Sequence, residues 1–299
     1  MATSWKVWTI AAPLAVLVMS GQAAAQRGHL AGLGANVVSD FKYLTNNLLL
    51  DTQDIITSPL YVASPDSALR SPKFYLVLAG AGALWGGSYA LDQTIRSRLR
   101  SMSSSDADLL ENVSFGSVGA ATALLYAYGL WDNEPRARHY ALTAGAGAGI
   151  ATLLNVGIKA AFGRLRPTQT SSHTAFFHGG QSFVSGEVTP IFGLATGVSE
   201  YYDNAWYVAV PVYSLALLDG FGRMGHDAHW FSDVIGAALL GVGTTKLFLW
   251  LHERHDEEPG RWRLFPIHRA RWRGDEQRRL NRRGVSLQLV GRSDLPISV

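Results

Sequence analysis

Six long apolar segments dominate the pattern of hydrophobic and polar positions after residue 73. They cover about 74–91, 113–131, 140–162, 183–199, 205–220 and 233–251, each 16 to 23 residues long with few or no charged side chains. The alternation typical of a half-buried strand is absent, and the segments are much longer than ordinary strands. We therefore expect six helices, and their many glycines and alanines favour close helix contacts.

Residues 26–73, before these segments, show a different pattern. Val37, Phe41, Leu44 and Leu48 recur at helical spacing with polar residues between them, which predicts an amphipathic helix. Such a helix can lie on a membrane surface or cover the core. Three prolines follow it and predict a structured loop.

The first 25 residues have the three parts of a secretory signal peptide. Lys6 precedes an apolar run over residues 7–19, and the small residues Ala23, Ala24 and Ala25 follow. This order predicts export with cleavage after Ala25. An uncleaved anchor helix is the alternative, but 13 apolar residues are short for crossing a bilayer.

Together these elements predict an all-α protein with a six-helix bundle over residues 74–252. Near-continuous apolar runs of this length are unusual in soluble helices, so we expect the bundle to be associated with a membrane. Two arrangements fit the pattern: helices that cross the inner membrane, and a periplasmic bundle that is soluble or partly embedded. Either way, the signal peptide predicts a location in a bacterial cell envelope.

Composition and charge exclude several other roles. The chain has no cysteine, which rules out disulfides, thiolate metal sites and a cysteine nucleophile. Residues 253–299 form a basic tail, in which residues 261–299 hold ten arginines against three acidic side chains. Anionic lipid head groups suit such a tail on an exported hydrophobic protein better than nucleic acid does, so we expect no nucleic-acid partner.

Charged side chains are rare in the apolar part of the chain, and several occur where the predicted helices end. Lys159 closes the third helix, Arg166 follows seven residues later, and Arg223 lies between the fifth and sixth helices. In an up-down bundle these connections lie at the same end. Three positive charges brought together need an anion, and phosphate matches one ammonium and two guanidinium groups.

Ser185 and Gly186, at the start of the fourth predicted helix, extend this anion site. Backbone N–H groups at a helix start attract anions, and a glycine allows a ligand to approach the backbone closely. We therefore expect the backbone of both residues to contribute to phosphate binding.

His229 is the candidate nucleophile. Asp233 follows four residues later, on the same face of a helix, and can accept a hydrogen bond from one imidazole nitrogen. The other nitrogen would then be free to attack phosphorus. A histidine at a helix start that is simply capped by a nearby aspartate would show the same spacing.

Three motifs in this order resemble the type 2 phosphatidic acid phosphatase (PAP2) superfamily. "KAAFGRLRP" fits Lys-x6-Arg-Pro, "SGE" nearly fits Ser-Gly-His, and "RMGHDAHWFSD" fits Arg-x5-His-x3-Asp. The resemblance covers about residues 110–251. It implies a six-helix core, metal-independent hydrolysis of phosphate esters and a phosphohistidine on His229. It also implies phosphate binding by Lys159, Arg166, Ser185, Gly186 and Arg223.

Glu187 is the main departure from the family pattern, because the family has a histidine there that protonates the leaving group. A glutamic acid can do this only if its surroundings favour the protonated form near working pH. Our hypothesis is that Glu187 is the general acid, with Asp233 and His229 as the other catalytic residues. In the alternative, Glu187 only pairs with an arginine, which would leave a slow enzyme or a protein that only binds phosphate.

We expect no metal and no cofactor at this site. His226, His229 and Asp233 could be drawn as metal ligands, but the nearby cationic side chains would repel a divalent cation. The sequence thus predicts a phosphatase acting on phosphate monoesters or on lipid phosphates. The alternatives are a vanadate-dependent haloperoxidase, which resembles the family in the same anion site, and a membrane protein that binds phosphate without catalysis.

Overall fold

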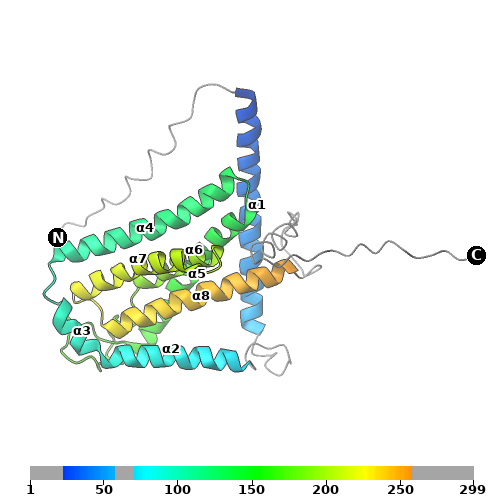
Figure 1. Cartoon of the computed structure of the whole chain (residues 1–299). Coiled ribbons are helices and arrows are strands. Elements are labelled where there is room, and N and C mark those ends of the chain that lie inside the picture. Colours follow the sequence, from blue (N-terminus) through cyan, green and yellow to red (C-terminus); the bar gives the residue numbers. More distant parts are fainter. Residues whose placement is uncertain (1–22, 58–70, 258–299) are drawn as a thin grey trace, which may run out of the picture.

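The computed structural model describes residues 23–57 and 71–257, which form eight helices and no strand (Figure 1). The helices are α1 (Ala23–Thr57), α2 (Pro72–Ala90), α3 (Asp92–Leu99), α4 (Ser104–Trp131), α5 (Pro135–Phe162), α6 (Val188–Tyr201), α7 (Trp206–Gly225) and α8 (Phe231–Glu257).

The all-α prediction is confirmed over the described residues. Each of the six predicted apolar segments corresponds to a helix, as α2 and α4 to α8, and α1 covers the segment predicted as an amphipathic helix. The predicted apolar face of α1 is not the buried one, because Val37 and Phe41 are exposed whereas Asp40, Asn46 and Asn47 are buried. The expected number of helices is too small, however, because the short helix α3 was not predicted. Its sequence, DQTIRSRL, is polar and gives no apolar periodicity from which a helix could be inferred.

Two helix boundaries differ from prediction for physical reasons. α4 begins at Ser104 rather than near residue 113. The apolar pattern missed this start because the first turns of the helix are polar. Ser103 caps this start by accepting a hydrogen bond from the Asp106 backbone N–H at 3.1 Å. α6 begins at Val188 rather than 183, since the preceding residues belong to a long connection after α5.

The predicted signal peptide and basic tail lie largely outside the described residues. Of the first 25 residues only Ala23 to Ala25 are described, and they form the first turn of α1. Of the predicted tail, residues 253–257 are described and form the end of α8.

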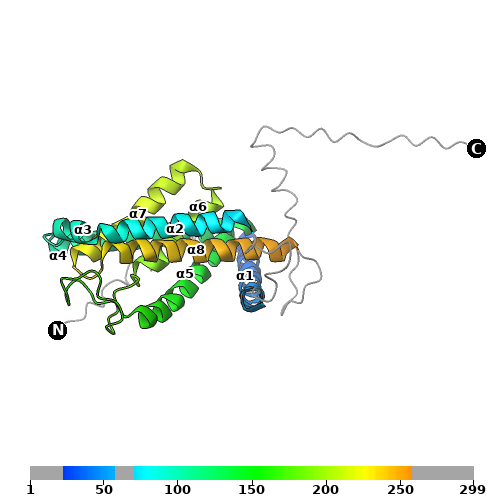
Figure 2. The same ribbon diagram turned by 90° about the horizontal axis from the view of Figure 1, so that it is seen from below.

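α6 is the central helix of the bundle. It packs against α4, α5, α7 and α8, and most of its side chains are buried. α4 pairs with α7, while α2 lies beside α8 (Figure 2). α1 runs crosswise to the long helices, at the end of the bundle opposite α3 (Figure 1).

Buried polar contacts fasten α1 to the bundle. Asp40 accepts hydrogen bonds from the Arg138 guanidinium of α5 at 3.0 and 3.1 Å. Asp51 lies 2.8 Å from Nε2 of His252 on α8. Because these groups are buried, breaking either contact would leave a desolvated charge, so α1 is held in a specific position.

α6 and α8 approach closely because glycines lie at their contact. A Cβ atom added to Gly241 would overlap the backbone carbonyl oxygen of Thr189, and one added to Gly193 would lie 3.0 Å from Oγ1 of Thr245. Gly243 lies two residues after Gly241 on α8, and a Cβ atom added to it would have nothing within 4 Å. The glycine at 241 is therefore required for packing, and the one at 243 is not.

Three helices of the described part, α4, α5 and α8, are long and apolar enough to cross a membrane. α2 and α3 pass the same test together but meet at an angle of 54°, which would make a bent fourth span. Large apolar side chains are exposed on the outer helices: Leu76, Val77, Leu124, Trp131 and Leu153. Such a surface is typical of a protein that is partly covered by lipid.

The two glycines of α8 provide a packing test. We expect Gly241→Ala to lower the thermal unfolding midpoint in detergent micelles, because overpacking against backbone costs about 1–3 kcal/mol. Gly243→Ala should leave the midpoint unchanged or raise it, since alanine is the better helix former by about 1 kcal/mol. Equal effects of the two substitutions would contradict the close contact between α6 and α8.

Candidate functional site

Five stretches of chain meet at one end of the bundle, beside α3 (Figure 1). Lys159 lies in the last turn of α5 and Arg223 in the last turn of α7, while Asp233 lies in the first turn of α8. The connection 163–187 and the short link that carries His229 complete the group. The prediction that the connections after α5 and α7 lie at the same end is confirmed.

Arg164 is the buried centre of this end of the bundle. Its guanidinium binds Asp233 on α8 at 2.5 Å and Asp92 on α3 at 2.6 Å. The remaining N–H groups donate to Oγ of Ser232 and to the His173 carbonyl oxygen. All five donors of this fully buried arginine are therefore used, and the chain after α5 is fixed to α3 and α8.

Aromatic rings surround the Arg164 guanidinium. Its central carbon lies 5.5 Å from the ring centre of Tyr89, 4.7 Å from that of Phe176 and 5.4 Å from that of Trp230. These rings exclude water, and charge pairs in such surroundings attract each other more strongly than in solvent. The result is a rigid support for the residues next to Arg164 and Asp233.

Asp233 is fully occupied by this support. Besides Arg164, it accepts hydrogen bonds from Oγ of Ser182 at 2.5 Å and from the Trp230 backbone N–H at 2.9 Å. The carboxylate thus joins the α5–α6 connection to the start of α8.

His229 is oriented differently from our prediction. Its Nδ1 lies 3.8 Å from the Asp233 carboxylate, too far for a hydrogen bond, and 2.8 Å from the Ser182 carbonyl oxygen. A carbonyl can only accept, so Nδ1 carries the proton and the Nε2 lone pair is left for chemistry. Asp233 acts on His229 indirectly, by holding the hydroxyl group of the same Ser182.

Burial lowers the pKa of His229 below its ordinary value of 6.5. The Asp233 carboxylate opposes this shift, whereas the positive charges of Lys159 and Arg223 add to it. The neutral imidazole, with a free lone pair, is therefore the stable form at neutral pH.

Asn155 of α5 holds the segment at the start of α6. Its amide donates to the carbonyl oxygens of Val184 at 3.2 Å and Ser185 at 2.9 Å. The Ser185 N–H donates to the Asp233 carbonyl at 3.2 Å, so it is not free for an anion as the sequence suggested. The buried Oγ of Ser185 has no hydrogen-bond partner, and the Gly186 N–H makes no backbone hydrogen bond among the described residues.

Lys159, Arg166 and Arg223 converge as predicted. Lys159 lies within electrostatic range of both arginines, and its Nζ is 3.6 Å from where a Cβ on Gly186 would be. Its ammonium group donates to the Gln181 carbonyl at 2.9 Å. Within the part of the chain that the structure describes, the Arg166 guanidinium makes no hydrogen bond or ion pair and is the available cation of the three.

Arg223 is held by two carboxylates. Its Nε forms an ion pair with Glu187, and its Nη1 lies 3.5 Å from Glu111 of α4. The side chain of Glu187 is 56% exposed. The pairing of Glu187 with an arginine, one of the two alternatives from the sequence, is thus present in the structure. If Glu187 is the proton donor, this ion pair must open when a substrate binds.

Sequence reasoning missed several residues that organise the site. Arg164 stands in the same short motif as Arg166, and spacing alone could not tell a buried arginine from a ligand-binding one. Ser182 holds His229 through its backbone carbonyl and Asn155 donates to backbone carbonyls, and such contacts leave no sequence signal. Asp219 is a buried carboxyl one turn before Arg223, and burial together with the neighbouring acidic residues raises its pKa to about 7.

The possible metal site of His226, His229 and Asp233, which sequence reasoning disfavoured, does not form. His229 contacts the Ser182 carbonyl, whereas His226 lies 3.1 Å from Asp108 of α4. The two imidazoles therefore belong to different groups of side chains.

Comparison with known proteins identifies one matching family. The model of the PAP2 superfamily matches residues 139–257, a range that includes every predicted site residue. A segment of 108 residues is 31% identical to the lipid A 1-phosphatase of Porphyromonas gingivalis. That alignment covers 36% of this chain and only 22% of the relative's length. No solved structure matches the chain.

Replacing Arg164 tests its role as the support of the site. We expect Arg164→Met to lower the free energy of unfolding by about 3–5 kcal/mol, because it leaves two buried carboxylates unpaired. Arg164→Lys should restore little, since one ammonium cannot reproduce the fork that joins Asp92 and Asp233. Arg98→Met, at an exposed arginine of α3, is the control in a thermal unfolding assay. Equal midpoints for the methionine variants at 164 and 98 would contradict this role.

Proposed function

We propose that the protein is a phosphatase of the PAP2 type that hydrolyses phosphate monoesters of membrane lipids, and the match of the PAP2 superfamily model to residues 139–257 supports this. The observation that carries the proposal is the cluster of Lys159, Arg166 and Arg223 beside a buried histidine whose Nε2 is available. Three converging cations with few internal partners favour a multiply charged anion, and a phosphate group supplies one.

In this proposal the substrate phosphate binds between the three cations. Among the described residues, the Arg166 guanidinium has no competing partner and the Lys159 ammonium group donates only to a backbone carbonyl. Arg223 would exchange Glu187 for phosphate oxygens. The Gly186 N–H and Ser185 Oγ are the neutral donors available nearby, and the Ser185 N–H is already used. Preorganised donors of this kind stabilise charge as it shifts in the transition state.

The reaction would proceed in two steps. The Nε2 lone pair of His229 bonds to phosphorus while the bond from phosphorus to the leaving oxygen breaks, and that oxygen takes up a proton. Water then attacks the phosphohistidine, the N–P bond breaks, and the proton of the water passes to the group that served as acid. Asp233 would hold Ser182, and through it the ring of His229, throughout both steps.

Glu187 would be the acid in the first step and the base in the second. In the structure its carboxylate neutralises Arg223. A bound phosphate would compete for Arg223, release Glu187 and place negative charge next to it, which favours the protonated carboxyl. Binding of the substrate would thereby prepare the proton donor.

The position of the site supports an amphiphilic substrate. It lies where α5 ends and α8 begins, which are two of the three candidate membrane spans. Phe162 and Phe177 expose apolar rings at this end. A phosphate in a lipid head group would reach the cations while its acyl chains stayed beside the apolar helices. Hydrolysis of a lipid phosphate would agree with the similarity to a lipid A 1-phosphatase and with the predicted location in a bacterial envelope.

A protein that binds phosphate without hydrolysing it is the second candidate. The ion pair between Glu187 and Arg223 favours it, because a carboxylate that stays bound to arginine cannot donate a proton. The two functions differ in whether a covalent phosphoenzyme forms.

Trapping of that intermediate tests the nucleophile. Quenching the wild-type protein with alkaline detergent during turnover of a 32P-labelled phosphatidate should give a labelled protein whose label is stable in alkali and lost in acid. His229→Ala should abolish both labelling and hydrolysis, because it removes the attacking nitrogen. His178→Ala, at an exposed histidine of the loop, should retain both. Labelling that survives in His229→Ala would exclude this nucleophile, and no labelling or turnover of any ester by the wild type would support the binding protein.

The pH dependence of kcat/KM separates the roles of His229 and Glu187. Because the pKa of His229 is lowered, the nucleophile keeps its lone pair to lower pH than an ordinary histidine, and the acid limb of kcat/KM should lie at correspondingly lower pH. Glu187→Gln should leave that limb in place but slow hydrolysis of alkyl phosphates by about 10²-fold or more, the usual contribution of a general acid. The loss should be small with p-nitrophenyl phosphate, whose leaving group needs no proton. An unchanged kcat/KM of Glu187→Gln with the alkyl ester would remove Glu187 from the reaction.

A further inference from the structure

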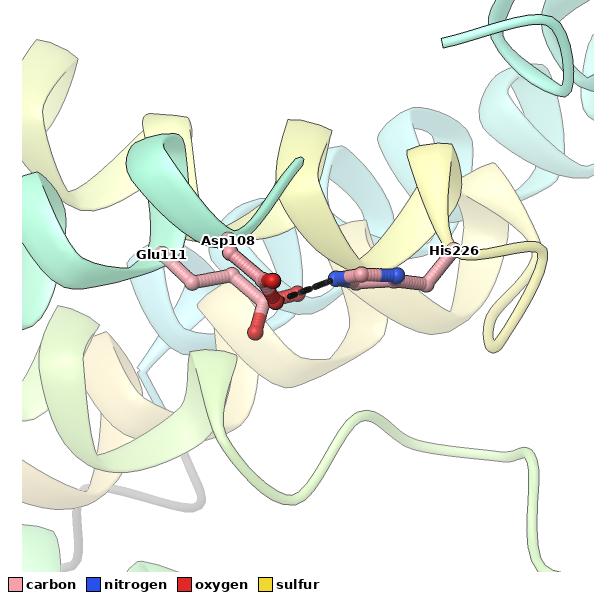
Figure 3. A group of neighbouring side chains, drawn as sticks. All are labelled: Asp108, Glu111 and His226. Carbon is pink, nitrogen blue, oxygen red and sulfur yellow. Dashed lines mark hydrogen bonds and ion pairs between the residues drawn. The ribbon is translucent and has the colours of Figure 1, made fainter. Parts of the chain in front are cut away.

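A second group of side chains lies on the other side of Arg223. Asp108 and Glu111 are three residues apart on α4 and share one face, and His226 follows α7 as its C-terminal cap. One ligand atom from each residue lies within 4.8 Å of the other two. Figure 3 shows the imidazole of His226 directed edge-on toward both carboxylates.

The geometry points to a binding site for a divalent transition metal ion, and we propose that Asp108, Glu111 and His226 hold one ion of the zinc or manganese type. Nε2 of His226 lies 3.1 Å from Oδ1 of Asp108 and 3.6 Å from Oε1 of Glu111. Two carboxylates and one imidazole suit such ions, whereas calcium and magnesium prefer oxygen ligands alone.

A buried oxygen of Glu111 distinguishes this group from an exposed acidic cluster. Oε1 of Glu111 is buried and accepts no hydrogen bond among the described residues, and its contact with Nε2 of His226 at 3.6 Å is an ion pair only when the imidazole is protonated. Its Oε2 faces Arg223 at 3.5 Å. A buried carboxylate oxygen without a donor is costly, and a metal ion at this point would satisfy it.

The backbone around the group is preorganised. A Cβ atom added to Gly222 of α7 would lie 2.5 Å from Cγ of Glu111 and 2.7 Å from the Ala107 carbonyl oxygen. The absence of a side chain at this glycine therefore lets α4 and α7 come together and places Glu111 next to His226. Asp108 is 64% exposed, so ions can enter and water can complete the coordination.

This group adjoins the proposed phosphate site, because Glu111 faces Arg223, but its three ligands are other residues. Asp108 and Glu111 lie outside residues 139–257, which the PAP2 superfamily model matches. No step of the proposed hydrolysis uses any of the three residues. Binding of the metal can therefore be measured without turnover, and either proposal can fail while the other stands.

Titration of the metal-stripped full-length protein in detergent micelles tests the proposal. Mn²⁺ binding is followed by loss of the electron paramagnetic resonance signal of the free ion, and Zn²⁺ binding by competition with a chromogenic chelator. The wild type should bind one ion that the Asp108→Asn and His226→Ala variants bind at least about tenfold more weakly, since even outer partners of a metal site contribute 10–100-fold. His178→Ala, at an exposed histidine elsewhere, should bind as the wild type does.

Asp108→Asn guards against misfolding, because it keeps the shape of a mostly exposed side chain. Zinc should also raise the thermal midpoint of the wild type and of His178→Ala, but not that of Asp108→Asn. Equal metal affinity in the wild type and in Asp108→Asn would overturn the proposal, as would the absence of any binding by the wild type. Reduced binding in His178→Ala alone would place the ion elsewhere and would overturn it too.

Discussion

The buried guanidinium of Arg164 is the interaction on which the rest of the site depends. It joins Asp92 of α3 to Asp233 of α8 while its own backbone belongs to the connection after α5. The positive charge of Arg164 between two carboxylates thus fixes three elements that are distant in sequence. All three side chains are buried, so solvent screens their attraction little. Because Asp233 also binds Ser182, and the Ser182 carbonyl sets the tautomer of His229, the orientation of the candidate nucleophile follows from this network.

A second constraint is the balance of charge among the three cations next to this network. Lys159, Arg166 and Arg223 would repel one another, and the structure moderates this with its own carboxylates, chiefly at Arg223. Glu111 and Glu187 therefore compete with any anion for the same guanidinium. Binding of phosphate becomes an exchange of partners rather than the filling of an empty place. The same exchange would change the surroundings of Glu187 when a proton donor is needed.

The sequence predicted the parts of this arrangement that depend on long patterns. Six apolar segments predicted six helices. Lys159, Arg166 and Arg223 were expected to lie together because they stand at alternate connections, which lie at the same end of an up-down bundle. It failed where the deciding contact is with backbone or with a distant residue. The partner of His229 is a carbonyl group, which every residue has. Arg164 resembles Arg166 in sequence, and only the position of Asp92, on the unpredicted helix α3, shows that it is buried.

The central claim is that one tetrahedral anion is held by three cations within reach of His229. A crystal structure of the protein soaked with tungstate, a phosphate mimic with strong anomalous scattering, tests it most directly. The account predicts an anomalous peak contacted by Lys159, Arg166 and Arg223, with the tungsten atom or an oxygen of the tungstate ion next to Nε2 of His229. A peak bound by other residues, or no peak at a saturating concentration, would contradict it.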